Sequence, residues 1–188
     1  MLGLDMMRLA LDLKPVVAAI LFCGGVAQAQ EGRLDDLFDA LRAAEGNDAE
    51  QIVGKIAAEW SKSGSPALDL LLVRGREALE AGEVDAAVGH LTALVDHAPG
   101  FAEGYNARAT AYFADQQFGP ALEDIRMTLA LNPRHFGAMT GLALVLDEID
   151  RPGQALAVWR EVERLYPASP EAARAIPELS REVEGRTL

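Results

Sequence analysis

The residues that could do chemistry are three histidines and many carboxylates, and their spacing predicts no catalytic or metal site. His90 and His97 are seven residues apart in one expected helix. That spacing is about 10 Å along a helix axis, too far for one metal ion to join them. His135 follows Pro133 and is expected in an exposed loop. Neighbouring carboxylates such as Asp147-Glu148 point about 100° apart on a helix, so they do not converge on a substrate.

The motifs and composition exclude several further classes of protein. No phosphate loop, dinucleotide fingerprint, nucleophile elbow or H-E-x-x-H zinc motif occurs, so we expect no enzyme, cofactor or metal. Cys23 is the only cysteine, which excludes a disulfide framework and a cysteine-rich zinc site. The 29 acidic and 17 basic residues leave a net charge of −12, which argues against a nucleic-acid partner.

The first 29 residues have the order of a secretory signal peptide. Arg8 and Lys14 precede an uncharged apolar run over residues 15–27, and Ala27 and Ala29 form a small-x-small cleavage signal. Because the run is shorter than the roughly 20 residues of a membrane span, we expect cleavage after Ala29 and a periplasmic mature chain. The mature chain would have no membrane span, because the apolar run leaves with the signal. It would also have no cysteine, because Cys23 leaves with the same segment. An uncleaved N-terminal anchor is the alternative.

A period of 34 residues organises the chain after this segment. Prolines 99, 133 and 167 recur at this interval. Three further columns keep the same phase: Ala87, Ala121 and Ala155; Gly75, Ala109 and Ala143; Leu71, Tyr105 and Met139.

In each unit, the helical spacing of the apolar residues predicts two amphipathic helices joined by a turn. The units span about residues 66–99, 100–133 and 134–167, and each closing proline ends the second helix. Residues 30–65 predict a degenerate helical hairpin in the same phase, with Asp48 as a helix N-cap. Residues 168–188 predict a C-terminal capping helix, which Pro177 is expected to kink or divide.

These columns resemble the tetratricopeptide repeat (TPR), whose pattern is W-x₂-L-G-x₂-Y…A-x₃-F…P. The resemblance covers residues 67–167 and departs from the pattern at Arg74 and Arg108, which replace Leu, and at Ala78, which replaces Tyr. It implies an all-α fold, an α-solenoid of antiparallel helix hairpins in a right-handed superhelix. Small residues are required where two helices approach to within about 8–10 Å.

In such a solenoid the first helix of each unit lines the concave face, so the exposed side of these helices is the candidate partner-binding site. A row at i, i+3, i+7 and i+10 avoids the packing positions. It consists of Asp69, Leu72, Arg76, Leu79, Glu103, Asn106, Thr110, Phe113, Gly137, Thr140, Leu144 and Asp147. The alternative is that Leu72, Leu79, Phe113 and Leu144 pack onto neighbouring helices.

The chemistry of this row bears on the partner. The family's peptide-carboxylate clamp uses several Lys, Arg and Asn residues, and here only Arg76 and Asn106 are available. A hydrophobic or basic protein segment is therefore expected to fit better than an acidic one. The sequence predicts an exported, non-catalytic TPR scaffold that binds a protein or peptide in its groove. The alternative is a self-associating structural or assembly subunit of a cell-envelope complex.

Overall fold

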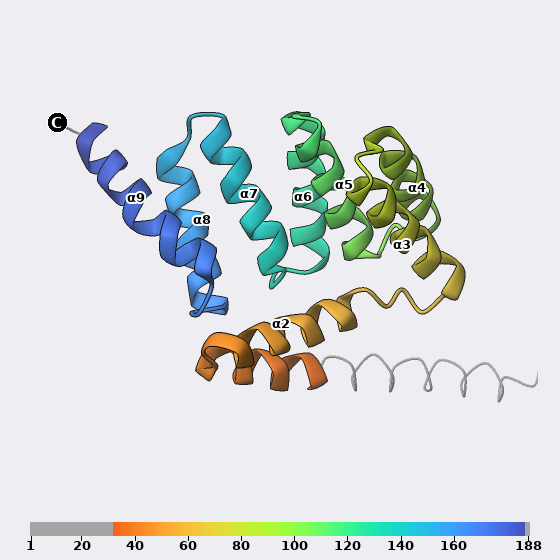
Figure 1. Ribbon diagram of the computed structural model, residues 1–188, viewed down its shortest axis with the longest axis horizontal. Helices are drawn as coiled ribbons and strands as arrows, with labels where there is room; N and C mark the ends of the chain where they lie inside the picture. Colours follow the sequence, from red (N-terminus) through yellow and green to blue (C-terminus); the bar gives the residue numbers. More distant parts are fainter. Residues whose placement is uncertain (1–31, 187–188) are drawn as a thin grey trace, which may run out of the picture. The chain divides into compact units, whose positions relative to one another are not determined.

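The computed structural model describes residues 32–186, and the predicted signal segment with Cys23 lies outside them. Contacts divide the chain into residues 1–36 and 37–188. Of the first part, residues 32–36 are described and helical. The second part contains helices and no strand within the described range (Figure 1). After the helix over residues 32–43, the helices are α2 (Gly46–Trp60), α3 (Pro66–Glu80), α4 (Val84–His97), α5 (Ala102–Ala114), α6 (Phe118–Leu131), α7 (Phe136–Glu148), α8 (Pro152–Leu165) and α9 (Pro170–Arg186).

Helices α3 to α9 pack in chain order, as an all-α solenoid of antiparallel hairpins does. The pairs α3–α4, α5–α6 and α7–α8 are the hairpins, and α9 packs on α8 at the C-terminal end. The second helix of each hairpin ends two residues before Pro99, Pro133 or Pro167. Proline disfavours a helical residue before it, so the three prolines end these helices at equivalent places. None of the helices in the described range is both long and apolar enough to cross a membrane.

The three hairpin turns share one backbone geometry. Gly82, Gln116 and Asp150 occur 34 residues apart and have φ values of 77°, 57° and 58°. The residue after each of them donates its backbone N–H back to the first helix: Glu83 to Ala78 O, Gln117 to Tyr112 O and Arg151 to Leu146 O, all at 2.8 Å. This is the Schellman pattern that ends a helix at a left-handed residue.

Small side chains let the paired helices approach. A Cβ atom added to Gly75 would lie 2.5 Å from Cγ of the buried Leu91, so α3 contacts α4 through its backbone. Ala109 and Ala143 occupy the same column in the next two hairpins and are buried. The columns predicted to be small are therefore the points of close helix packing.

Two local predictions, Asp48 as an N-cap and a division of the last helix at Pro177, were wrong. Asp48 is not the N-cap, because Gly46 with a φ of 52° makes the turn and α2 begins there, which leaves Asp48 in the first turn. Pro177 does not divide the last helix, which is continuous over α9. Both Pro177 and Ala173, whose carbonyl loses its usual donor, are exposed. Water can therefore satisfy that carbonyl, and the helix continues.

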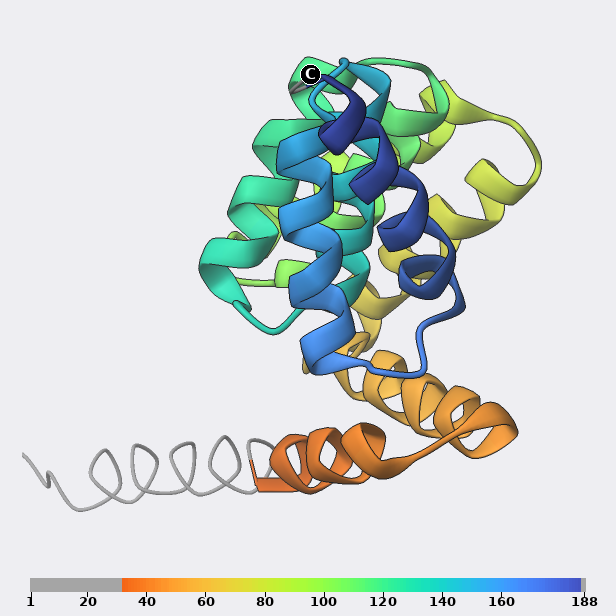
Figure 2. The same cartoon turned by 90° about the vertical axis from the view of Figure 1, so that its left-hand side faces the viewer.

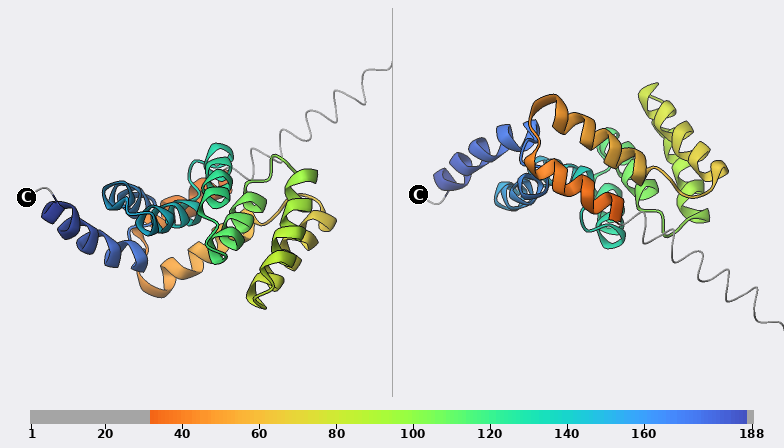
Figure 3. Two further views of the ribbon diagram at one scale, coloured as in Figure 1. Left: turned by 90° about the horizontal axis from the view of Figure 1, so that it is seen from above. Right: turned by 90° about the horizontal axis from the view of Figure 1, so that it is seen from below.

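Residues 37–60 do not stack on α3 as one more unit; in the described contacts they pack against the beginning of α7. Trp60 stacks on His135 with ring centroids 4.2 Å apart and lies 5.1 Å from the ring of Phe136. Phe38 contacts the edge of Phe136 at 6.2 Å, and Phe136 contacts Tyr166 at 5.8 Å. Figures 2 and 3 show α2 along this edge of the array.

Candidate binding groove

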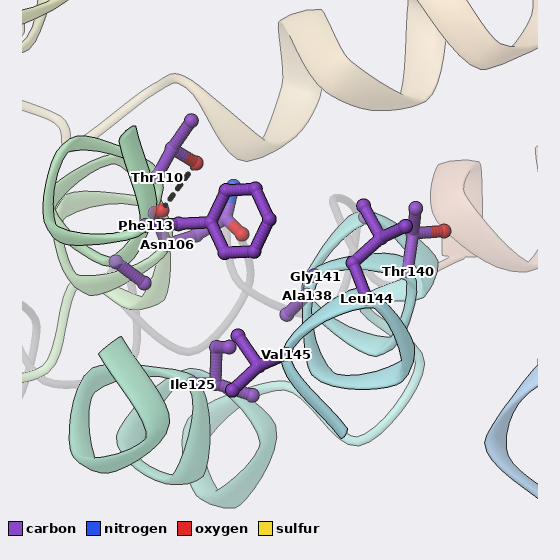
Figure 4. A pocket seen from close by; sticks show the side chains of 11 residues that line it. Asn106, Thr110, Phe113, Ile125, Ala138, Thr140, Gly141, Leu144 and Val145 are labelled. Carbon is purple, nitrogen blue, oxygen red and sulfur yellow. Dashed lines mark hydrogen bonds between the residues drawn. The ribbon is translucent and has the colours of Figure 1, made fainter. Parts of the chain in front are cut away.

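A pocket of about 210 Å³ lies between α5 and α7, with α6 behind it (Figure 4). Most of its lining is apolar, and the polar atoms come from one amide and two hydroxyl side chains. The lining residues are Asn106, Ala109, Thr110, Phe113, Ile125, Gly137, Ala138, Thr140, Gly141, Leu144 and Val145. An apolar side chain could therefore be buried in this pocket, away from water.

The pocket exists because small residues face each other across it. Ala109 on α5 and Gly137 and Gly141 on α7 leave space that larger side chains would fill. A Cβ atom at Gly141 would make only an ordinary contact, 3.6 Å from Cδ1 of Ile125. Figure 4 shows the Phe113 ring pointing from α5 across the gap toward α7.

Five of the predicted concave-face residues line this pocket together with Gly137: Asn106, Thr110, Phe113, Thr140 and Leu144. Leu144 is 40% exposed although its side chain is entirely apolar. Phe113 is half-buried and packs against Phe118, with ring centroids 5.8 Å apart. The residues of the predicted row that line the pocket therefore lie on α5 and α7.

The predicted residues of α3 do not reach the pocket. Leu72 is 1% exposed and belongs to the core between α3, α4 and α5, so its assignment to an exposed face was wrong. Leu79 packs against the same core, as the packing alternative predicts for both residues. Asp69 accepts hydrogen bonds from N and Oγ of Ser63, at 2.8 and 2.5 Å, and so holds the linker before α3. Asp147 is exposed at the end of α7, outside the pocket lining.

Glu103 was also expected on the exposed face, and this was wrong. Its side chain is buried at the beginning of α5, where it forms an ion pair with Arg76 and lies 2.7 Å from Nε2 of His135. Burial raises the pKa of the Glu103 carboxyl, but the hydrogen bond with His135 and the positive charge of Arg76 outweigh burial and lower it. Arg76 also donates to Oγ of Ser61 at 3.1 Å, so Arg76 joins α3, α5 and the end of α2.

His135 is 2% exposed, in contrast to the exposed loop position predicted for it. It caps α7: its Nδ1 accepts a hydrogen bond from Ala138 N at 3.1 Å. Because Nδ1 accepts, it carries no proton, so Nε2 carries the hydrogen that is donated to Glu103. The imidazole is thus held by Glu103 on α5, by the beginning of α7 and by the indole of Trp60 on α2.

No protein-family model matches the chain. A curated TPR repeat-containing protein of Rhizobium etli is 32% identical over 154 residues, which cover 81% of this chain and 76% of that protein. The chain belongs to the TPR repeat-containing proteins.

Several solved structures, two of them TPR domains, share the fold at lower identity. The first TPR of Spaghetti (RPAP3), bound to an HSP90 peptide, has a TM-score of 0.60 at 23% identity and covers 62% of this chain and 93% of that domain. The Sgt2 TPR domain from Aspergillus fumigatus has a TM-score of 0.61 at 22% identity, with coverage of 65% and 83%. The translocator chaperone SycD from Yersinia enterocolitica has a TM-score of 0.60 at 13% identity, with coverage of 64% and 96%.

One departure from the TPR pattern has a structural reason. Arg108 replaces the usual Leu, and it makes a two-point contact with Asp124, from Nε at 2.7 Å and from Nη2 at 2.8 Å. Asp124 is buried on α6, and Arg108 Nη1 reaches Oγ1 of Thr92 on α4 at 3.2 Å. The hydrogen bond to Asp124 raises the pKa of the Arg108 guanidinium, although burial lowers it. The Arg108–Asp124 ion pair thus joins α5 and α6 at a position where other TPR units use an apolar leucine.

The repeat period contained a signal for the burial of His135. Phe101, His135 and Ser169 occupy one column at the start of α5, α7 and α9, and Phe101 is half-buried while the other two are buried. Each directly precedes a helix that packs on the preceding hairpin. Among residues 32–186, no three His, Cys, Asp or Glu side chains are placed to hold a metal ion.

Proposed function

We propose that this TPR protein is an exported, non-catalytic scaffold that binds a protein or peptide segment in the pocket between α5 and α7. The observation that carries this proposal is the apolar pocket itself, with Phe113 and Leu144 presented on its two sides. Burial of an apolar anchor is the main source of affinity at such a site.

The structural neighbours support a binding role. The first TPR of Spaghetti is bound to an HSP90 peptide. The TPR2B domain of yeast Sti1 forms a complex with pHsp70. This chain shares their hairpin array, and a repeat array of this kind works by presenting a shaped surface.

The polar side chains of the groove favour a hydrophobic or basic segment over an acidic one. Within the predicted row, Arg76 and Asn106 are the two side chains that could hold a peptide carboxylate, but Arg76 lies outside the pocket and is already paired with Glu103. Asn106 Nδ2 also lies within 3.4 Å of that carboxylate. A partner's carboxylate would therefore compete with the buried Glu103 carboxylate for Arg76 and Asn106.

Export to the periplasm is supported by the order of charged, apolar and small residues before Gln30. The test is the N-terminus of the protein recovered from the cell envelope. Mass spectrometry is expected to find Gln30 as its first residue. A recovered chain that still begins before residue 15 would support the anchor alternative instead.

The binding proposal is tested with Phe113→Asp and Leu144→Asp in the full chain. Each places a carboxylate in the apolar pocket and is expected to remove partners that the wild-type protein captures from the envelope fraction. Leu131→Asp is the matched control, because Leu131 is also 40% exposed but lies outside the pocket. Unchanged capture by both pocket variants, with wild-type helicity, would contradict the proposal.

A self-associating structural or assembly subunit of a cell-envelope complex is the second candidate function. Leu70 and Val73 are 48% and 45% exposed, and they lie one turn apart on α3. Sedimentation over a concentration series is expected to show oligomers that Leu70→Glu abolishes. A wild-type protein that remains monomeric at all concentrations would remove this candidate.

A further inference from the structure

Phe113 takes part in two neighbouring hollows of different chemistry. One is the apolar pocket between α5 and α7. The other is a hollow of about 330 Å³ at the far ends of these helices, lined by Phe113, Ala114, Gln116, Phe118 and Glu148. A single extended segment that crosses Phe113 would place neighbouring side chains in both hollows.

Glu148 continues the pocket's own row of residues along α7. Gly137, Gly141, Leu144 and Glu148 follow one another at spacings of four, three and four residues, so they share one side of the helix. Glu148 is exposed, and none of the ion pairs formed by the described residues involves it. Its carboxylate is therefore available to a cation at the end of the row.

The charged side chain that lines this hollow, Glu148, is acidic. Asp115 ends α5, and Asp147 and Glu148 end α7, where the helix dipole adds further negative potential. No Lys or Arg lines either hollow. An acidic residue of a partner would be repelled here, while a Lys or Arg would be attracted.

We propose that the segment bound by this TPR protein carries a branched aliphatic side chain followed closely by a lysine or arginine. The aliphatic side chain enters the pocket between Phe113 and Leu144, and the cation lies against Glu148. This inference rests on the proposed function and adds to it that one segment satisfies both hollows at once.

The test measures binding of short synthetic peptides to the full chain by fluorescence anisotropy. One peptide has a core of two leucines followed by two lysines in a glycine–serine frame. Its counterparts replace the lysines by glutamates or the leucines by alanines. The leucine–lysine peptide is expected to bind at least about tenfold more tightly than either counterpart. This preference for lysine should weaken between about 50 mM and about 300 mM salt, because the attraction acts near the surface.

Substitutions at Glu148 and at Gly141 separate the contributions of the two hollows. Glu148→Gln is expected to weaken the leucine–lysine peptide by about two- to fivefold, the range for an exposed ion pair. Glu148→Lys is expected to weaken it further and to favour the glutamate peptide. Glu163→Lys makes the same charge change on the exposed side of α8 and should leave both affinities unchanged. Gly141→Leu fills the pocket and is expected to abolish binding of all leucine peptides while keeping the helical content.

Several outcomes would overturn the inference. Equal affinity for the lysine and glutamate peptides, or an effect of Glu148→Lys no larger than that of Glu163→Lys, would refute the ionic part. Binding that survives Gly141→Leu in a folded protein would refute the aliphatic part. If no peptide binds while Phe113→Asp still removes captured partners, this inference fails and the proposed function stands. If Phe113→Asp has no effect on captured partners either, the proposed function fails as well.

Discussion

Nε2 of His135 lies 2.7 Å from Oε2 of Glu103, and both side chains are buried although they are 32 residues apart. This contact joins the beginnings of α5 and α7, the two helices on either side of the pocket. The stacked indole of Trp60 extends it to α2. The helices on either side of the pocket are therefore joined by a polar contact that protonation of Glu103 can disturb.

Glu103 should make the stability of the protein depend on acid. Its pKa is lower in the folded chain than the usual value of 4.5, so the unfolded chain binds the proton more readily. The stabilisation is complete well above pH 4.5 and is lost as the pH falls through the folded pKa. Urea unfolding between about pH 6 and about pH 3 should show a smaller fall in stability for Glu103→Gln than for the wild type. Glu163→Gln is the exposed control, and equal pH dependence in all three proteins would contradict the assignment.

Trp60→Ala should loosen residues 37–60 without unfolding the TPR hairpins. The substitution removes the stack on His135 and the contacts with Phe38 and Phe136, at a cost of about 1–3 kcal/mol for a half-buried aromatic residue. Hydrogen exchange is expected to accelerate in residues 37–60 and to change little in α5 and α6. Phe118→Ala, in the second hollow, serves as the aromatic control. Equal loss of protection throughout the chain would show that the hairpin and the array unfold as one.

Two glycines within one hairpin should respond to alanine with opposite signs. Gly75→Ala puts a Cβ atom 2.5 Å from the buried Leu91 and should destabilise the protein by about 1–3 kcal/mol. Gly89→Ala, in the middle of α4, meets no atom within 4 Å and should stabilise it by about 0.5–1 kcal/mol through helix propensity. Urea midpoints at neutral pH measure both effects. A Gly75→Ala protein as stable as the wild type would mean that α3 and α4 can separate freely.

Restoring the TPR leucine at position 108 should harm this chain. Arg108→Leu leaves the buried Asp124 without its cation, and we expect a loss of about 3–5 kcal/mol. The double variant Arg108→Leu with Asp124→Leu should recover much of this loss, because no unpaired charge then remains. Thermal and urea unfolding of the three proteins test the coupling. Additive effects of the two substitutions would show that the side chains do not act as a pair.

The repeat period was sufficient to predict the hairpins. Prolines 99, 133 and 167 mark where helices end, and the small columns mark where helices touch, because both effects act within one unit or between neighbours. The turns were only partly visible. Gly82 signals a left-handed residue, whereas Gln116 and Asp150 adopt the same geometry without a glycine to announce it.

The candidate binding face was harder to predict, because a helical row does not show what lies opposite it. Five residues of the row line one pocket: Asn106, Thr110, Phe113, Thr140 and Leu144. It placed Leu72 and Glu103 on the same face, yet Leu72 is covered by the core and Glu103 by Arg76 and His135. Gly141 and Ile125 were missed, since a pocket is defined by the side chains around an empty space.

The sequence by itself determined the family, the period and the order of helices, because these depend on contacts between residues close along the chain. Only the tertiary structure decided that residues 37–60 pack at the start of α7 and that Glu103 is buried there. Both result from side chains far apart along the chain meeting in space, and no local pattern encodes such a meeting. The three histidines illustrate the difference. Their spacing predicted no catalytic or metal site, whereas the tertiary structure brings His135 into contact with the buried Glu103.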